Sequence, residues 1–243
     1  MPSDAVAVVS DAHLGQAPPE VTDAFHRFLD AVPALAGHLV INGDLFDFWF
    51  EYRAVIPRRA FPVLSALDRL RRAGVRLTLT GGNHDRWGGD FWQRELGAAF
   101  HPDGTSLALA GRRAYVAHGD GLAERHRSAR LMHRVTRWPA TAALFRWLHP
   151  DLGVRLVDAM SGTLAESTRD ETVLARAAAA QAAWARAYLA DHPEVELLVL
   201  GHTHRPALEE VAPGRWYLNP GAFLEGGRYA LITADGPALR SFP

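Results

Sequence analysis

The feature that most constrains this chain is a repeated pattern of short apolar runs, each of which ends directly in polar or glycine residues. The first three runs end at an aspartate, at a glycine and at a pair of glycines; they are Ala5–Ser10, His38–Asn42 and Val75–Thr80. Short apolar runs bounded by turn residues are typical of buried strands. We therefore predict a fold built around a sheet whose strands deliver polar groups to one edge.

Segments with helical spacing separate these runs. Val21–Leu29 has such spacing, and Arg58–Arg72 places four large apolar side chains on one face before Gly74 ends the helix. The order strand, helix, strand, helix, strand is typical of a parallel sheet, in which functional loops gather at the carboxyl ends of the strands. We predict this arrangement for the first part of the chain.

The second half of the sequence predicts a hairpin, a helical stretch and a return to strands. The hairpin is expected around Gly111, between Leu107–Ala110 and Ala114–His118. Residues from about 122 to 190 are rich in helix formers, and we interpret them as a helical insertion followed by a long helix that ends near Leu189. The strands then resume at Leu197–Leu200, Trp216–Leu218, Tyr229–Thr233 and Ala238–Ser241.

Composition excludes several classes of protein. The chain has 243 residues, 48% of them hydrophobic, which is enough for a sizeable core, and its net charge of −1 argues against general nucleic-acid binding. It has no cysteine, which excludes disulfides, thiolate nucleophiles and cysteine-ligated zinc. All 26 basic residues are arginine, so anions would be bound by guanidinium groups or backbone amides. No signal peptide and no run of about 20 apolar residues is visible, so we expect a cytoplasmic protein, with peripheral contact to the inner membrane left open.

Five polar clusters follow the predicted strands, and each combines Asp, His or Asn with glycine or another turn residue. They are Asp11-Ala12-His13, Gly43-Asp44-Leu45-Phe46-Asp47, Gly82-Asn83-His84-Asp85, His118-Gly119-Asp120 and Gly201-His202-Thr203-His204. Any one of them alone could be an ordinary turn. Together their carboxylate, imidazole and amide groups suit Mn, Fe, Zn or Mg. A carboxylate such as Asp44 can bridge two ions, and two close ions can clamp a phosphoryl group and activate a water molecule.

In this combination and order, the five clusters resemble those of the calcineurin-like metallophosphoesterase superfamily. The resemblance covers nearly the whole chain outside the helical stretch. It implies a four-layer α/β/β/α sandwich with an inserted helical cap. We therefore predict a core of residues 1–120 and 191–243 and a cap of residues 121–190.

The resemblance also implies a role for each candidate site residue. The first metal would be bound by Asp11, His13, Asp44 and His204, and the second by Asp44, Asn83, His118 and His202. A hydroxide activated by the metals would attack phosphorus in line, and His84 would contact the phosphate and protonate the leaving oxygen. Asp85 would either orient His84 or cap a turn, and Asp47 would support a ligand rather than bind metal. Two divalent ions are expected, Mn first, with Mg, Fe or Zn as alternatives.

Two segments narrow the resemblance to the UDP-2,3-diacylglucosamine pyrophosphatases of lipid A synthesis. They are Gly43–Trp49 and the pair His118–Leu122 and Leu144–Gly153. Those enzymes release UMP and 2,3-diacylglucosamine 1-phosphate at the inner membrane surface, and their cap holds the acyl chains. An arginine stripe beside bulky apolar residues in the cap suits such a substrate or a membrane interface, but also a helical pair with a solvated face. The candidate substrate contacts are Arg125, Arg130, Arg134, Arg155 and Arg169.

Other functions stay open at this point. A metallophosphoesterase for a soluble phosphodiester or phosphomonoester, such as a cyclic nucleotide, a nucleotide or a phosphoprotein, would use the same metal ligands. A nuclease is disfavoured because no stretch interleaves aromatic and basic residues for base stacking. A non-catalytic scaffold on this fold is disfavoured because every candidate ligand and His84 are present. The sequence does not indicate the oligomeric state.

Overall fold

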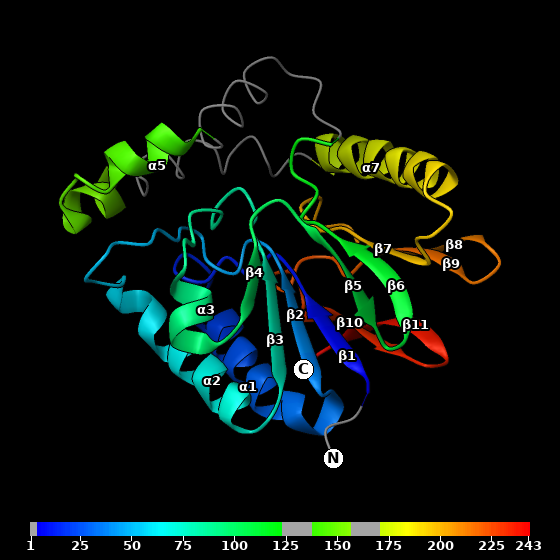
Figure 1. The fold of residues 1–243 in the computed structure, drawn as a ribbon, viewed down its shortest axis with the longest axis horizontal. Coiled ribbons are helices and arrows are strands. Elements are labelled where there is room, and N and C mark those ends of the chain that lie inside the picture. The colour runs from blue at the N-terminus through cyan, green and yellow to red at the C-terminus, as the bar shows by residue number, and fades with distance from the viewer. Residues whose placement is uncertain (1–3, 123–137, 157–170) are drawn as a thin grey trace.

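The computed structural model describes residues 4–122, 138–156 and 171–243, which form two β-sheets with helices against their outer faces (Figure 1). The larger sheet has the order β11 (Gly236–Ser241), β10 (Arg228–Thr233), β1 (Val6–Val9), β2 (His38–Asn42), β3 (Arg76–Thr80) and β4 (Ala99–His101). The smaller sheet has the order β5 (Thr105–Leu109), β6 (Arg112–Val116), β7 (Leu197–Val199), β9 (Arg215–Asn219) and β8 (Ala207–Ala212).

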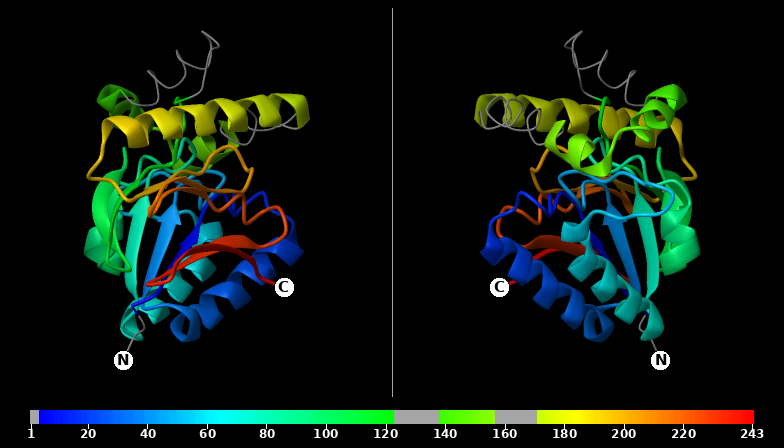
Figure 2. Two further views of the ribbon diagram at one scale, coloured as in Figure 1. Left: turned by 90° about the vertical axis from the view of Figure 1, so that its right-hand side faces the viewer. Right: turned by 90° about the vertical axis from the view of Figure 1, so that its left-hand side faces the viewer.

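The elements stack in four layers because each central strand is buried on both faces. Along β1, Ala7 and Val9 pack among the helices, whereas Val6 and Val8 pack against the other sheet, as the two-residue period of a strand requires. The helices on the outer face of the larger sheet are α1 (Pro19–Leu35), the short η1 (Arg58–Ala60), α2 (Phe61–Arg72) and α3 (Phe91–Leu96). The long helix α7 (Glu171–Asp191) covers the smaller sheet (Figure 2). The predicted α/β/β/α sandwich is therefore confirmed.

Both sheets are mixed rather than wholly parallel. The predicted parallel order of β1, β2 and β3 is confirmed by their registers, and β4 extends it. However, β10 joins β1 antiparallel, and β5 and β8 lie antiparallel to β6 and β9 at the two edges of the smaller sheet. The sequence analysis also missed α3, β4 and β8. These elements are short or half exposed, so their side-chain periodicity is weak.

The two described helices of the predicted cap pack differently against the core. Helix α7 packs Ala185 and Leu189 against Leu198 and Leu200 of the smaller sheet region, so it forms one of the four layers. Helix α5 (Pro139–Phe145) lies apart from the sheets in Figure 1, and it contacts the core through an aromatic cluster described below. The bounds of the cap stay a prediction. Among the described residues, no helix is long and apolar enough to cross a membrane.

Candidate metal centre

The five predicted clusters converge at one end of the sandwich, where strands of both sheets stop. Asp11 follows β1, Asp44 follows β2 and His84 follows β3, all in the larger sheet. His118 follows β6 and His202 follows β7 in the smaller sheet. Because the two sheets pack face to face, their carboxyl ends bring these loops together. Nε2 of His118 lies 3.1 Å from Oδ2 of Asp44, which is a contact across the two sheets.

The side chains form overlapping groups of metal-ligating atoms. In the part of the chain that the structure describes, three groups have one ligand atom from each residue within 4.8 Å of the others: Asp11 with His13 and His204, Asp44 with His118 and His202, and Asp44 with His13 and His84. Asp44 and His13 each belong to two of them, and Oδ2 of Asp44 lies 4.0 Å from Nε2 of His13. Asp44 therefore links the group that contains His118 and His202 to the group that contains His13 and His84.

Backbone strain is concentrated on the same residues. Six non-glycine residues of the described chain have positive φ, and five of them are candidate ligands: Asp11 (54°), His13 (47°), Asp44 (52°), His202 (68°) and His204 (58°). A bulky residue in this left-handed region costs of order 1–3 kcal/mol and persists only where the surroundings enforce it. Such strain clusters at functional sites, and the five strained ligands lie on the three loops that follow β1, β2 and β7, so this distribution marks those three loops as parts of one site.

Two glycines make room for the ligands. A Cβ on Gly43 would lie 2.3 Å from Nδ1 of His118, and one on Gly82 would lie 2.1 Å from Oδ1 of Asp44. Any side chain at these positions would displace a candidate ligand. The glycines that punctuate the sequence motifs are therefore required by the close approach of loops from neighbouring strands.

Hydrogen bonds from the surrounding chain orient the imidazoles. His118 donates from Nδ1 to the carbonyl of Asn42 over 2.9 Å, which leaves Nε2 as the metal-facing atom. His204 contacts Oε1 of Glu225 through Nδ1 at 3.2 Å, while its Nε2 lies 3.4 Å from Oδ1 of Asp11. Supports of this kind fix the ring orientation of metal-binding histidines. The sequence analysis missed Glu225, because a single glutamate in a glycine-rich loop carries no motif.

The carboxyls and the imidazoles of the site affect metal binding in opposite directions. Burial opposes ionisation of Asp11 and Asp44, yet the nearby histidines hold the pKa of both carboxyls below its usual value. Burial lowers the pKa of His13 to about 4. Burial also opposes protonation of His204, but Asp11 and Glu225 raise its pKa to about 10. Carboxylates that stay ionised are ready ligands, while a protonated imidazole must lose its proton before it can bind metal.

The donor set fits divalent ions. Among the described residues, the buried Oδ1 of Asn83 has no hydrogen-bond partner. Buried oxygens without partners are costly unless something else binds them. Asn83 is next to His84, whose backbone N–H donates to Oδ1 of Asp44 over 3.0 Å, so the asparagine lies beside the bridging position. Oxygen and imidazole donors without thiolate match the metals expected from the sequence.

His84 is held with one ring nitrogen available. Its Nδ1 donates to the carbonyl of Asp47 over 2.6 Å, and its ring lies edge-on to His13 with the centroids 4.9 Å apart. Burial alone would lower the pKa of His84, but the Asp44 carboxylate and the Asp47 carbonyl raise it overall. Asp85 accepts the backbone N–H groups of Gly82 and Leu45 at 2.8 and 2.7 Å. Its hydrogen bonds thus tie two loops together, as in the turn-cap alternative, and the ring of His84 is oriented by Asp47.

Asp120, in the fourth cluster, is part of a buried ion pair. Nη2 of Arg86 lies 3.0 Å from Oδ2 of Asp120, and both side chains are buried. Arg86 follows the Asn83–His84 loop, so this pair joins that loop to the one carrying His118. Asp120 therefore stabilises the arrangement of the loops.

The predicted substrate arginines are placed only in part. Arg155 is exposed, and the structure gives it no contact with the metal-ligand cluster. The other four lie outside the described residues; they are Arg125, Arg130, Arg134 and Arg169. Their role stays a prediction.

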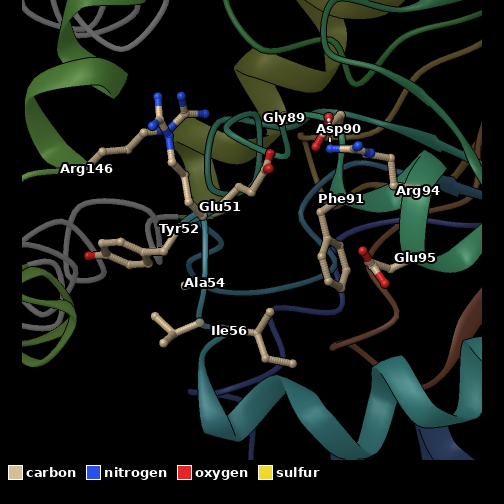
Figure 3. Close-up of a pocket in the computed structure, with 12 residues that line it drawn as sticks. Glu51, Tyr52, Ala54, Ile56, Gly89, Asp90, Phe91, Arg94, Glu95 and Arg146 are labelled. Carbon is tan, nitrogen blue, oxygen red and sulfur yellow. Dashed lines mark hydrogen bonds and ion pairs between the residues drawn. The ribbon is translucent and has the colours of Figure 1, made fainter.

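A cavity of about 740 Å³ lies where the loops that follow Asp47 and His84 meet Arg146 at the end of α5 (Figure 3). Glu51 points toward Gly89 and Asp90 in this cavity, and burial together with Asp90 raises the pKa of Glu51. Arg94, Tyr52 and Ile56 complete the main part of the lining. None of the candidate metal ligands lines it. Its charged groups suit a polar ligand better than an acyl chain.

An aromatic cluster connects α5 to the core next to this cavity. The ring of Phe145 lies 4.7 Å from that of Phe50, and 5.6 Å from those of Phe48 and Trp87, between centroids. Phe48 and Phe50 continue the Asp44–Asp47 loop, and Trp87 continues the His84 loop. The described part of the cap is therefore anchored on the same loops that carry the candidate ligands.

Comparison with known proteins gives one consistent result. The family model described as calcineurin-like phosphoesterase matches residues 5–206. A protein named UDP-2,3-diacylglucosamine hydrolase from Porphyromonas gingivalis is 32% identical over 80% of this chain and 81% of its own length. One with the same name from Pectobacterium carotovorum is 30% identical over 98% of this chain and 99% of its own. Among solved structures, Vps29 from Cryptosporidium parvum aligns with a TM-score of 0.49 and 12% identity over 100% of this chain and 93% of its own, which is too distant to inform activity.

Proposed function

This chain belongs to the calcineurin-like phosphoesterase family and is a metal-dependent hydrolase, and from that premise we propose that it hydrolyses the diphosphate of UDP-2,3-diacylglucosamine to UMP and 2,3-diacylglucosamine 1-phosphate. The observation that carries the proposal is the cluster of strained, buried ligands around Asp44, in a chain about 30% identical to hydrolases of that name over 98% of its length. The reaction belongs to lipid A synthesis.

The proposed centre holds two divalent ions. Mn is the preferred candidate for both, and Mg, Fe or Zn are the alternatives. Asp11, His13, Asp44 and His204 would hold the first ion, and Asp44, Asn83, His118 and His202 would hold the second. When bound, the ions supply charge stabilisation at phosphorus and an activated water molecule. The buried Oδ1 of Asn83, which has no hydrogen-bond partner, supports this assignment.

The chain's own residues complete the proposed chemistry. His84 is fixed by the Asp47 carbonyl through Nδ1, so Nε2 is the atom that can hydrogen-bond to the substrate phosphate. Because the surrounding groups raise the pKa of His84, this ring is suited to carry a proton and to give it to the leaving oxygen. Asp85 and the pair Arg86–Asp120 keep the loops around it in place.

We also propose that the described part of the cap meets lipid. Several large apolar side chains in this part of the chain are exposed, and Trp147 is 89% exposed; the others include Trp138, Leu144, Leu152 and Leu156. Tryptophan and leucine at exposed positions near arginine are typical of segments that enter the membrane interface. Co-sedimentation with anionic lipid vesicles should fall for the double variant Trp138→Ser/Trp147→Ser and not for Leu208→Ser, which removes an exposed leucine on β8. Equal binding of all three proteins would refute this placement.

The substrate assignment is tested by product analysis. The Mn-loaded protein should release UMP from UDP-2,3-diacylglucosamine, and mass spectrometry should detect the UMP. It should cleave UDP-N-acetylglucosamine, which has no long acyl chain, much more slowly. Absence of UMP at micromolar enzyme, with cleavage of a small chromogenic phosphodiester intact, would favour the alternative of a phosphoesterase for a soluble substrate. Absence of any phosphoester cleavage would refute the site itself.

A further inference from the structure

A glutamine far from the metal clusters in sequence makes direct contact with one of their loops. Gln181 lies in the Ala-rich helix α7, and its side chain is fully buried. Its Nε2 donates to the carbonyl of Gly201 over 3.0 Å, and its Oε1 accepts from Oγ1 of Thr203 at 3.3 Å. These two contacts lie on either side of His202, a candidate ligand of the second metal.

The same glutamine belongs to a closed polar network. Its Oε1 also accepts from the hydroxyl of Tyr217 at 2.8 Å and from Nδ2 of Asn219 at 3.0 Å. Nδ2 of Asn219 also lies 3.0 Å from the carbonyl oxygen of Gly201 and 3.1 Å from Oγ1 of Thr203, so its two N–H groups are shared among three acceptors. Every polar atom of the Gln181 amide therefore has a partner, and a satisfied buried network of this kind holds its members in a single arrangement.

The loop that the network holds is one that needs support. His202 and His204 both have positive φ, at 68° and 58°, which is unfavourable for a histidine. Strained residues persist only where their surroundings over-determine them. Around His202, the Gln181 and Asn219 contacts fix the residues on both sides, and its own N–H donates to Oδ2 of Asp11 over 3.1 Å.

Helix α7 is attached to the following segment at two further points. Glu171, at its start, pairs with Arg205, the residue directly after His204. Arg186 pairs with Glu209 of β8 at 2.6 and 2.8 Å. Both pairs are largely exposed and contribute little by themselves. The buried amide of Gln181 is the contact that reaches the ligand loop.

We propose that Gln181 is a positioning residue, whose side-chain amide holds the Gly201–His204 loop in the conformation that directs His202 and His204 to the metals. The inference rests on the metal centre of the proposed function and adds to it a residue outside the motifs. It also connects the metal centre to α7, the helix that directly follows the insertion. A merely structural glutamine would affect stability without affecting metal affinity.

The test is to titrate the metal-free full chain with Mn²⁺ alone and to measure the binding affinity by isothermal titration calorimetry. Gln181→Leu keeps the approximate volume and removes all four hydrogen bonds, and we expect its Mn²⁺ affinity to fall about 10- to 100-fold, the range for lost support of a metal ligand. The kcat should fall at limiting Mn²⁺ and recover at saturating Mn²⁺, with KM nearly unchanged. The control is Leu189→Ala, which removes a fully buried side chain from the same helix and should lower Tm but not Mn²⁺ affinity.

A second variant covers the case in which Gln181→Leu does not fold. Gln181→Glu keeps an acceptor for Thr203, Tyr217 and Asn219 but, when ionised, cannot donate to Gly201, so its affinity should fall by a smaller factor. Wild-type affinity in a folded position-181 variant, or an equal loss in Leu189→Ala, would overturn the inference alone. A wild-type chain that binds no Mn²⁺ would overturn the inference together with the proposed function.

Discussion

Replacing Asp44 by asparagine should weaken metal binding by an amount that follows from the charge that is removed. The side chain is buried, and its Oδ2 lies 3.1 Å from Nε2 of His118 and 4.0 Å from Nε2 of His13. Asparagine keeps the shape and the acceptor for the N–H of His84, so the fold should be retained. What is lost is a negative charge at the position shared by the two proposed metal ions.

The size of the effect follows from charge and linkage. At an effective dielectric constant of about 20, a unit charge attracts another roughly 3 Å away by about 5 kcal/mol, which is more than a 1000-fold change in affinity. At an Mn²⁺ concentration 100 times the wild-type Kd, binding stabilises the wild-type chain by about 2.7 kcal/mol. For a chain of this size that raises Tm by about 5–11 °C. A 1000-fold weaker site gains less than about 0.1 kcal/mol at the same concentration, so its Tm should hardly move.

Thermal unfolding with and without Mn²⁺, followed by circular dichroism, measures this difference, and turnover should fall by at least about 1000-fold in the same variant. The matched control is Asp30→Asn, which removes an exposed carboxylate on α1 and should behave as wild type in both assays. An Mn²⁺-dependent rise in Tm of Asp44→Asn equal to that of the wild type, or retained turnover, would refute the bridging role.

Three further outcomes are expected. His84→Ala should lower kcat by about 100- to 10,000-fold while the bound Mn²⁺ stays unchanged, because His84 acts on the phosphate and not as a ligand; a lower metal content by elemental analysis would contradict this. Glu225→Gln should weaken Mn²⁺ binding by about 10-fold, because the charge that holds Nδ1 of His204 is removed, and calorimetry that shows no change would exclude the support role. Near pH 8, Mn²⁺ binding should release protons, because the pKa of His204 is raised to about 10 and that of His118 also lies above its usual value in the metal-free site. Affinity should therefore increase with pH, and calorimetry in buffers of different ionisation enthalpy should show the release; a pH-independent affinity between 6 and 9 would contradict it.

The sequence predicted that the candidate metal ligands would lie close together, because each of them follows a strand within a few residues. Asp11, Asp44 and His118 are placed by local chain geometry, and the packing of two sheets then brings them together. The parallel order of β1, β2 and β3 could also be predicted from the sequence, because strands buried on both faces appear there as continuous apolar runs.

Long-range packing could not be predicted in the same way. Gln181 and Glu225 reach the site from a distant helix and a distant loop, and neither shows periodicity or a motif. The antiparallel pairing of β10 with β1 likewise depends on where the chain returns after the insertion, which local propensity does not record. The role of Asp85 was left open between two alternatives, because only the fold shows that its oxygens meet backbone N–H groups from two loops.

The central claim is a centre of two metal ions bridged by Asp44, and anomalous X-ray scattering from crystals grown with Mn²⁺ tests it most directly. Two anomalous peaks are predicted, about 3.5–4 Å apart as in other two-metal sites, with the Asp44 carboxylate between them. One peak should lie against Asp11, His13 and His204, and the other against Asn83, His118 and His202. A single peak, or two peaks without Asp44 between them, would contradict the account.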